Sequence, residues 1–291
     1  MNRTACLGFA LTALSLGCGG GATPPAAAPV PTTATAAETG STVDTKLKAS
    51  LAGPQRTEKE RARDAYRHPR ETLEFFGLKD TDTVIEISPG EGWYTAVLAP
   101  VLHDHGKLIV VGGDPKGDPN SEGTKHALAL QDRFQKTPQA FDRVQPVVMS
   151  YDASSPWGAP ESADVVLTFR NLHNWIEDGK ADKVLAQVFK VLKHGGVLGL
   201  TDHRANPGAS IDPKVIGDSG YVPEEYIEKV VEAAGFKLAA KSDINSNPKD
   251  TKDYPKGVWT LPPVYAAGAT DHAKYEAIGE SDRMTLKFVK P

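Results

Sequence analysis

The sequence predicts an α/β protein built on a seven-stranded, mostly parallel sheet with helices on both faces. Two observations predict this fold: short β-branched runs alternate with amphipathic helical segments, and the first such run leads directly into a glycine turn. Strands that alternate with helices form parallel sheets, because each right-handed crossover returns the chain to the same edge. We expect strands over residues 84–87, 107–111, 144–149, 163–169, 197–201, 237–241 and 283–290.

Helical segments separate these strands. Residues 92–100, 122–134, 178–192 and 223–234 are expected to be helical. The helical period is clearest in the third of these segments, where the apolar residues on one face are Val184, Leu185, Val188, Val191 and Leu192. Before the sheet, residues 58–76 predict two helices that are broken at Pro69, because proline interrupts the hydrogen bonding of a helix interior.

The glycine turn after the first strand has the properties of a ligand-binding loop. Residues 84–95 read V-I-E-I-S-P-G-E-G-W-Y-T, so a buried strand stops at P-G and a helix follows. Glycines let a ligand approach the backbone closely, and the first turn of a helix offers unpaired N–H groups. An α/β protein that binds nothing at this turn is the alternative.

Two known spacings compete for this loop. The dinucleotide fingerprint G-x-G-x-x-G lacks its third glycine, because Thr95 stands in that place. The methyltransferase spacing, acidic-x-G-x-G-x-G, fits better. Glu86, Gly90 and Gly92 are in register with it, and only its first glycine is replaced, by Ser88.

The composition bounds the class of protein. The chain has 291 residues, of which 40% are hydrophobic and 24% charged, and this suits one globular domain with extensions. The net charge of −4 leaves no basic excess, so we expect no nucleic-acid partner.

The N-terminus resembles a bacterial lipoprotein signal. Arg3 precedes an apolar run over residues 5–16 that is too short to span a bilayer. The following S-L-G-C resembles a lipobox, so residues 1–17 are predicted to be a signal peptide and Cys18 to carry a lipid. A secretory signal cut near Gly20 is the alternative. The domain is therefore expected to be exported and membrane-anchored, on the periplasmic or cell-surface side, and cytoplasmic only if the N-terminus is not a signal.

Residues 18–45 are predicted to form a flexible tether. This stretch is rich in alanine, proline and threonine, is almost uncharged, and shows no helical or strand period. The folded domain would then cover residues 46–291, with N-terminal helices over residues 46–78 and an insertion over residues 242–282. An insertion of that length is usually functional or disordered, and Trp259 and Tyr265 indicate that this one packs back on the domain.

A basic and aromatic cluster precedes the sheet. It consists of Arg63, Tyr66, Arg67 and His68. One interpretation is a solvated helix face, which charge runs usually form. The other is a lid over the carboxylate of a bound cofactor, which the positive charge would favour.

Four pieces of the sequence together resemble the class I S-adenosylmethionine-dependent methyltransferases. They are E-I-S-P-G-E-G-W-Y-T, L-K-H-G-G-V-L, Y-V-P-E-E-Y-I-E-K-V-V-E-A-A-G-F-K-L and G-E-S-D-R-M-T-L-K-F-V-K-P, in this order. They look like a bacterial branch of predicted methyltransferases with P-G-x-G-W-Y-T loops. The resemblance covers about residues 61–291 and implies the Rossmann-like class I fold, in which a hairpin closes the sheet at the C-terminus.

The resemblance implies S-adenosyl-L-methionine as the cofactor. Glu86, Gly90 and Gly92 would hold its methionine end, with Ser88 in the place of a glycine and Trp93 and Tyr94 packed nearby.

The same resemblance assigns residues after three later strands. Asp114 would bind the ribose hydroxyls, although it stands two positions late; Asp152 would accept from the adenine amino group; Asn171 would face the reacting methyl. Capping a loop, for Asp114, and forming an Asx turn, for Asp152, are the alternatives.

Histidines provide the candidate catalytic bases. Methyl transfer needs a base only when the nucleophile must lose a proton, and histidine suits that role near neutral pH. His173 follows the fourth strand and is the first candidate; His203 follows the fifth and is the second. Each could instead merely cap a loop. Asp202 could orient an imidazole or bind a metal, but no metal-binding spacing is present, so no metal is predicted.

The predicted function is S-adenosylmethionine-dependent methyl transfer to a small-molecule acceptor. The alternative is a non-catalytic exported lipoprotein that uses the same fold to bind a small molecule or a partner protein. Export would separate the domain from a cofactor that is made in the cytoplasm. A nicotinamide oxidoreductase is a more distant possibility, because of the missing third glycine.

Overall fold

One seven-stranded sheet organises the domain, in the order β3-β2-β1-β4-β5-β7-β6. The computed structural model describes residues 38–152 and 155–291, so the predicted signal peptide, Cys18 and most of the predicted tether lie outside the described residues. Strands β1 to β5 run parallel, whereas β7 is antiparallel to both β5 and β6. The strands are β1 (Thr83–Ile87), β2 (Lys107–Gly112), β3 (Gln145–Val148), β4 (Ala163–Phe169), β5 (Leu192–His203), β6 (Lys237–Ser242) and β7 (Arg283–Val289).

This arrangement confirms the predicted α/β fold with a seven-stranded, mostly parallel sheet. Each predicted strand is present, and β5 is longer at both ends than the predicted 197–201. The helices are α1 (Glu38–Ala52), α2 (Glu58–Ala62), α3 (Asp64–Arg67), α4 (Pro69–Phe76), α5 (Thr95–Leu102), α6 (Glu122–Lys136), α7 (Pro138–Phe141), α8 (Leu172–Glu177), α9 (Ala181–Val191), α10 (Pro213–Ser219), α11 (Glu224–Ala233) and α12 (His272–Ile278), with a 3₁₀ turn η1 (Gly257–Thr260).

Several helix boundaries differ from the predicted ones. Helix α1 begins at Glu38, inside the predicted tether, because tertiary contacts can order a segment of weak helical pattern. Ser50 of α1, for example, donates a hydrogen bond to the backbone oxygen of Val97 in α5 at 2.7 Å. The segment before Pro69 divides into α2 and α3, and Pro69 starts α4, where its missing N–H costs nothing.

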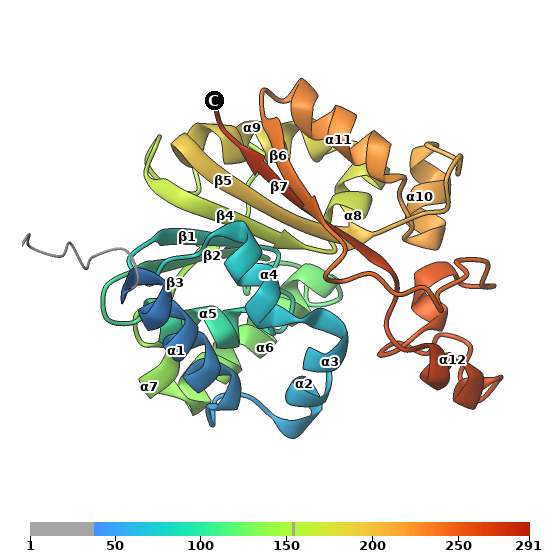
Figure 1. Cartoon of the computed structure of the whole chain (residues 1–291), viewed down its shortest axis with the longest axis horizontal. Coiled ribbons are helices and arrows are strands. Elements are labelled where there is room, and N and C mark those ends of the chain that lie inside the picture. Colours follow the sequence, from blue (N-terminus) through green and yellow to red (C-terminus); the bar gives the residue numbers. More distant parts are fainter. Residues whose placement is uncertain (1–37, 153–154) are drawn as a thin grey trace, which may run out of the picture. The chain divides into compact units, whose positions relative to one another are not determined.

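Apolar side chains of alternate strand positions build a separate core on each face of the sheet. Ile85 and Ile109 pack with residues of α8, α9 and α11, whereas Val84 and Leu108 pack with residues of α1, α4 and α5. Figure 1 shows these two groups of helices on opposite sides of the sheet. Among residues 38–152 and 155–291, no helix is long and apolar enough to cross a membrane.

The insertion between β6 and β7 returns to the carboxyl ends of the parallel strands. Its 3₁₀ turn brings the Trp259 ring to 5.8 Å from His173 and 6.2 Å from His203, measured between ring centroids. Tyr265 instead stacks on His272, at 4.1 Å, within the insertion itself. Helices α2 and α3 approach the same end of the sheet (Figure 1), so two segments from opposite ends of the domain cover this edge.

A glycine in β5 sets how closely α4 packs on the sheet. A Cβ atom at Gly199 would lie 2.7 Å from ring carbons of Phe76 and 2.8 Å from a methyl carbon of Leu167. Both neighbours are buried, so neither can move into solvent. The absent Cβ therefore lets α4, and with it α2 and α3, lie against the strand.

We expect Gly199→Ala to lower the free energy of unfolding by about 1–3 kcal/mol, because it overpacks this contact. Urea unfolding followed by circular dichroism measures the change. Gly123→Ala is the control, since a Cβ there would meet only Gly113, at an ordinary 3.8 Å. Equal stability of wild type and Gly199→Ala would contradict the role given to this contact.

Candidate functional site

The loop after β1 has the backbone geometry of a ligand-binding glycine turn. Ser88, Gly90 and Gly92 have φ angles of 50°, 60° and 84°, all in the left-handed region. A Cβ at Gly92 would lie 2.6 Å from a methyl carbon of Leu130, whereas a Cβ at Gly90 would meet nothing within 4 Å. Glycine at position 92 is thus required by packing, and position 90 borders open space that a ligand can use.

Ser88 adopts the conformation that the replaced glycine of the methyltransferase spacing would adopt. Its backbone N–H donates to the carbonyl oxygen of Val111 in β2 at 2.8 Å. A left-handed conformation costs roughly 1–2 kcal/mol for a residue with a side chain. The loop therefore keeps its shape with serine at this position, at some cost in stability.

Glu86, at the end of β1, is a buried carboxyl group. Its side chain is 1% exposed and accepts a hydrogen bond from the Thr95 hydroxyl at 2.6 Å. Burial raises the pKa of Glu86 to about 7, although hydrogen bonds from Thr95 and the charge of Arg133 act in the opposite direction. A cationic or hydroxylated ligand beside this carboxyl would favour its ionised form.

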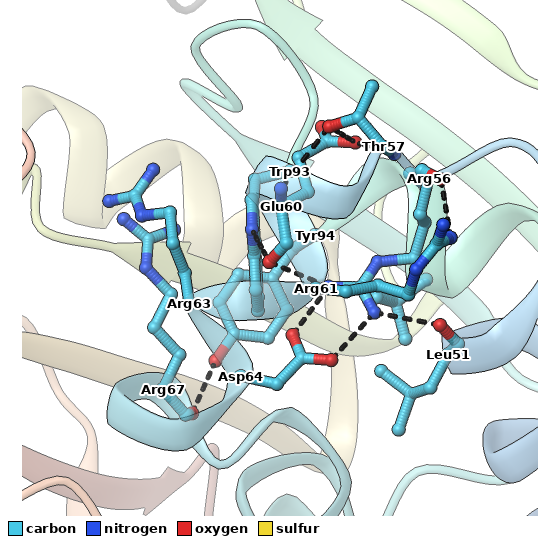
Figure 2. A network of polar contacts seen from close by, with 12 residues as sticks. Leu51, Arg56, Thr57, Glu60, Arg61, Arg63, Asp64, Arg67, Trp93 and Tyr94 are labelled. Atoms are coloured by element: carbon cyan, nitrogen blue, oxygen red, sulfur yellow. Dashed lines mark hydrogen bonds and ion pairs between the residues drawn. The ribbon is translucent and has the colours of Figure 1, made fainter.

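Trp93 and Tyr94 attach the N-terminal helices to the glycine loop. The indole N–H of Trp93 donates to the Glu60 carbonyl oxygen at 3.2 Å, and the guanidinium carbons of Arg56 and Arg67 lie 5.0 and 4.6 Å from the indole centroid. Figure 2 shows the indole between these two arginines. The Tyr94 hydroxyl donates to the Arg67 carbonyl oxygen at 3.3 Å. Both side chains are buried in this joint, and their predicted contact with a cofactor stays a prediction.

Asp114 and Asp152 both lie in exposed turns at the carboxyl edge of the sheet. A side-chain oxygen of Asp114 accepts from the backbone N–H of Lys116 at 2.8 Å, which is the loop-capping role given above as its alternative. The Asp152 backbone N–H donates to Ser150 Oγ at 3.1 Å, and its carbonyl oxygen accepts from Gln187 at 2.8 Å. Their predicted contacts with ribose and adenine remain predictions.

Asn171 joins the end of β4 to the glycine loop. Its side-chain amide donates to the carbonyl oxygens of Ile87 and Ser88, at 3.2 and 3.3 Å, and to the hydroxyl of Thr168 at 3.1 Å. The amide therefore fixes the relative positions of two adjacent strand ends, and its predicted place beside a reacting methyl group is untested.

His173 and Asp202 form a fully buried pair across two strands. His173 Nδ1 lies 2.7 Å from an Asp202 carboxylate oxygen, and both side chains are 0% exposed. The same carboxylate also accepts the backbone N–H groups of His173 at 3.1 Å and of His203 at 2.8 Å. Because the carboxylate is an acceptor, the neutral His173 carries its proton on Nδ1, and Nε2 keeps its lone pair. Nε2 is enclosed and has no hydrogen-bond partner among the described residues.

His203 is the second buried imidazole of this site. Its Nδ1 lies 2.6 Å from the Ser281 hydroxyl, and its Nε2 is enclosed without a partner in the described part of the chain. Burial, followed by the charges of His173 and Arg170, lowers the pKa of His203 well below its ordinary value. The rings of His173 and His203 lie 5.3 Å apart. His203 thus stays neutral near neutral pH.

His173, Asp202 and His203 each offer a possible metal-ligand atom, and these atoms lie within 4.8 Å of one another. The sequence spacing does not reveal this group, because His173 lies in α8, after β4, whereas Asp202 and His203 end β5. The positive charges of Arg170, Arg283 and Arg67 reach His203 and oppose the binding of a cation. The same charges disfavour a proton on His203, so His173, whose ring is held by the Asp202 carboxylate, is the better proton acceptor of the two.

Three arginines surround one buried carboxylate: Arg63 and Arg67 of the predicted basic cluster, and Arg283, which the sequence did not single out. Glu280 accepts from Arg63 Nε at 2.6 Å, from Arg67 Nε at 3.0 Å and from Arg283 Nη1 at 3.0 Å. Arg67 is 3% exposed, so the interpretation as a solvated helix face is wrong for it, whereas Tyr66 is 41% exposed and does fit that interpretation. The G-E-S-D-R run before the last strand was the available signal for Glu280 and Arg283.

Comparisons with known proteins identify the fold. No protein-family model and no curated protein matches the sequence. A SAM-dependent methyltransferase from Aquifex aeolicus is similar in structure over 85% of this chain and 98% of its own, with 16% identity and a TM-score of 0.52. The [4+2]-cyclase SpnF is similar over 86% of this chain and 93% of its own, with 18% identity and a TM-score of 0.54. StiE O-MT is similar over 84% of this chain and 81% of its own, with 19% identity and a TM-score of 0.51. The chain therefore has the Rossmann-like fold that these proteins share.

The raised pKa of Glu86 predicts how stability depends on pH. Because the folded pKa of about 7 exceeds the ordinary glutamate value of 4.5, the folded state holds the proton more tightly, and the protein loses stability as the pH rises between these values. Glu86→Gln cannot ionise and should gain about 3 kcal/mol relative to wild type between pH 4 and pH 8. Urea unfolding of both proteins at the two pH values measures this.

The effect should persist at high salt, because burial is its main cause and salt screens buried groups weakly. A constant stability difference between wild type and Glu86→Gln at both pH values would show that Glu86 titrates normally.

Proposed function

We propose that this domain is an S-adenosylmethionine-dependent methyltransferase that acts on a small-molecule acceptor. The observation that carries the proposal is the glycine loop: a left-handed turn with open space at Gly90 stands beside the buried carboxyl of Glu86. The fold supports the proposal but does not decide the reaction, since a [4+2]-cyclase has a similar structure.

The residues of the loop suit such a cofactor. Gly90 presents backbone without a side chain, and Glu86 offers a buried carboxyl that a positively charged group would ionise. Asp114 and Asp152 stand at the ends of the next strands of the same half of the sheet and would bind the ribose and the adenine. When bound, S-adenosylmethionine supplies a methyl group on a positively charged sulfur that is already a good leaving group.

The protein's own contribution would be to position the acceptor and to take up its proton. His173 Nε2 has a free lone pair, and Asp202 holds the ring by its Nδ1 proton, as a general base requires. Asp202 thus orients the imidazole of His173, which follows the neighbouring strand β4. It does not orient the imidazole of His203, the next residue in the sequence, whose Nδ1 contacts Ser281 instead. The Trp259 ring packs beside both imidazoles, tilted against His173 and edge-on to His203.

The alternative function is a binding domain without catalysis, carried by an exported lipoprotein. It would keep the fold while losing the cofactor, so cofactor binding separates the two hypotheses. The His173–Asp202 pair favours the enzyme, because a buried histidine with a partnerless nitrogen lowers stability and has no purpose in a passive fold.

We expect S-adenosylmethionine and S-adenosylhomocysteine to bind the purified protein with about −8 kcal/mol, a micromolar affinity. Gly90→Arg should abolish this binding, because its side chain would fill the open space. Isothermal titration calorimetry measures both ligands.

Gly195→Arg is the matched control. Gly195 also has a positive φ, 75°, and a Cβ there would also meet nothing within 4 Å, but it lies at the amino end of β5. This variant should bind both ligands as wild type does. A folded wild-type protein that gives no heat with either ligand would exclude the methyltransferase.

We further propose that the N-terminus is processed as a lipoprotein signal and that Cys18 carries the lipid. In the full chain expressed in a bacterium, Cys18→Ser should abolish lipid incorporation, because the thiol is the attachment point. Cys6→Ser should leave it unchanged, since Cys6 belongs to the segment that is removed. Mass spectrometry of the mature protein reads the outcome, and a lipid retained in Cys18→Ser would refute the assignment.

A further inference from the structure

We propose that the acceptor of this proposed methyltransferase carries an oxyanion, a carboxylate or a phosphate, which binds beside Arg170 at the carboxyl ends of β4 and β5. That the bound molecule is a methyl acceptor rests on the proposed function. The anion site itself rests on three separate observations: Arg170 has no partner among the described residues, three neighbouring arginines have enclosed donors without partners there, and two of those three, Arg67 and Arg283, are buried.

Arg170 is a half-buried arginine with no direct partner. Its side chain makes no hydrogen bond and no ion pair with any of residues 38–152 and 155–291, and none of its nitrogens is enclosed. Its backbone has a φ of 64°, which a residue with a side chain rarely adopts. Two unfavourable features at one residue indicate that this arginine is kept for a ligand.

The neighbouring arginines have donors that the protein does not satisfy. Nη2 of Arg63, Nη2 of Arg67 and Nε of Arg283 are enclosed and have no hydrogen-bond partner in the described part of the chain. Arg67 and Arg283 are only 3% and 4% exposed. Native proteins rarely leave enclosed charged donors without partners, so these groups indicate a missing acceptor.

The charges decide which acceptor fits. The guanidinium groups of Arg63, Arg67, Arg170 and Arg283 act on one another. Within the described part of the chain, Glu280 is the one carboxylate that pairs directly with any of them. Burial, together with the charges of Arg283 and Arg63, lowers the pKa of Arg170 to about 10 against the opposing effect of Glu280. Water would satisfy the donors but not the charge, whereas an oxyanion would satisfy both.

The location connects the anion to the proposed chemistry. Arg170 directly precedes Asn171 and lies close enough to Asp202 and His203 for its charge to affect both groups. Glu280 and Ser281, which hold the arginines and His203, also line a cavity of about 170 Å³ between the N-terminal helices and the insertion. An acceptor that placed its oxyanion beside Arg170 would therefore have its other end near the two imidazoles.

The experiment uses the purified protein and the variant Arg170→Gln. Because the Arg170 side chain has no partner among the residues that the structure describes and is repelled by other arginines, the variant should unfold at the wild-type temperature or above it. Titration calorimetry with inorganic phosphate and with acetate, at low ionic strength, should show binding of at least one anion to wild type. Arg170→Gln should weaken that binding about tenfold or more, because it removes a charge-assisted contact. The preferred anion distinguishes a phosphate-bearing from a carboxylate-bearing acceptor.

Arg143→Gln is the matched control. It removes one positive charge from an exposed arginine whose guanidinium donates to the carbonyl oxygen of His103, beyond the end of α5. It should leave anion binding unchanged. Absence of binding to wild type, or equal weakening in both variants, would overturn the proposal.

A third titration separates the acceptor from the cofactor. S-adenosylhomocysteine should bind Arg170→Gln as tightly as wild type. If its affinity falls while that of methylthioadenosine, which lacks the carboxylate, does not, Arg170 binds the cofactor and the acceptor assignment is wrong. Anion binding without any S-adenosylhomocysteine binding would refute the methyltransferase and leave the anion site standing.

Discussion

The buried carboxylate of Glu280, just before β7, joins the N-terminal helices to the other end of the domain. It accepts hydrogen bonds from Arg63 and Arg67, which belong to the N-terminal helices, and from Arg283 at the start of β7. Burial alone would raise the pKa of Glu280, but Arg67 and Arg283 hold it well below its ordinary value. Removing one partner of a buried pair costs about 3–5 kcal/mol. Glu280 therefore fixes the N-terminal helices and the insertion over the same edge of the sheet.

A second buried carboxylate, Asp202, has a different set of partners. It accepts two backbone N–H groups and the Nδ1 proton of His173. Glu280 thus forms ion pairs with guanidinium groups, whereas Asp202 accepts hydrogen bonds from neutral donors. Because His173 uses Nδ1 as its donor, its Nε2 keeps a lone pair. The result is a proton acceptor close to a surplus of guanidinium groups. This pairing of a proton acceptor with guanidinium groups suits a particular kind of ligand. Such a ligand has a nucleophile that must lose a proton and an anionic group elsewhere in the molecule.

The sequence predicts what depends on local pattern. The strands follow from β-branched runs, and the glycine loop follows from the spacing of Glu86, Gly90 and Gly92. It does not predict the partner of Asp202, because that partner depends on the register in which β4 and β5 pair, with Phe169 opposite Thr201. The Glu280 cluster escapes prediction for a related reason. Its arginines are separated from it by up to 217 residues, and ion pairs at such separations leave no periodic signal.

The backbone itself marks where the ligand should lie. Ser88 and Arg170 each follow directly after a strand, each has a left-handed conformation, and each donates its N–H to a neighbouring strand, to Val111 and Thr201 respectively, at 2.8 Å. Their strands, β1 and β4, are adjacent, and the order of the sheet reverses between them. Ligands of doubly wound sheets bind at this reversal, where the two connections leave in opposite directions and open a crevice. Two residues with side chains adopt a conformation that glycine would adopt more easily, and they do so on both sides of that crevice. Of the seven described residues that have a side chain and a positive φ, these two are the ones that directly follow a strand, at the edge that the topology independently selects.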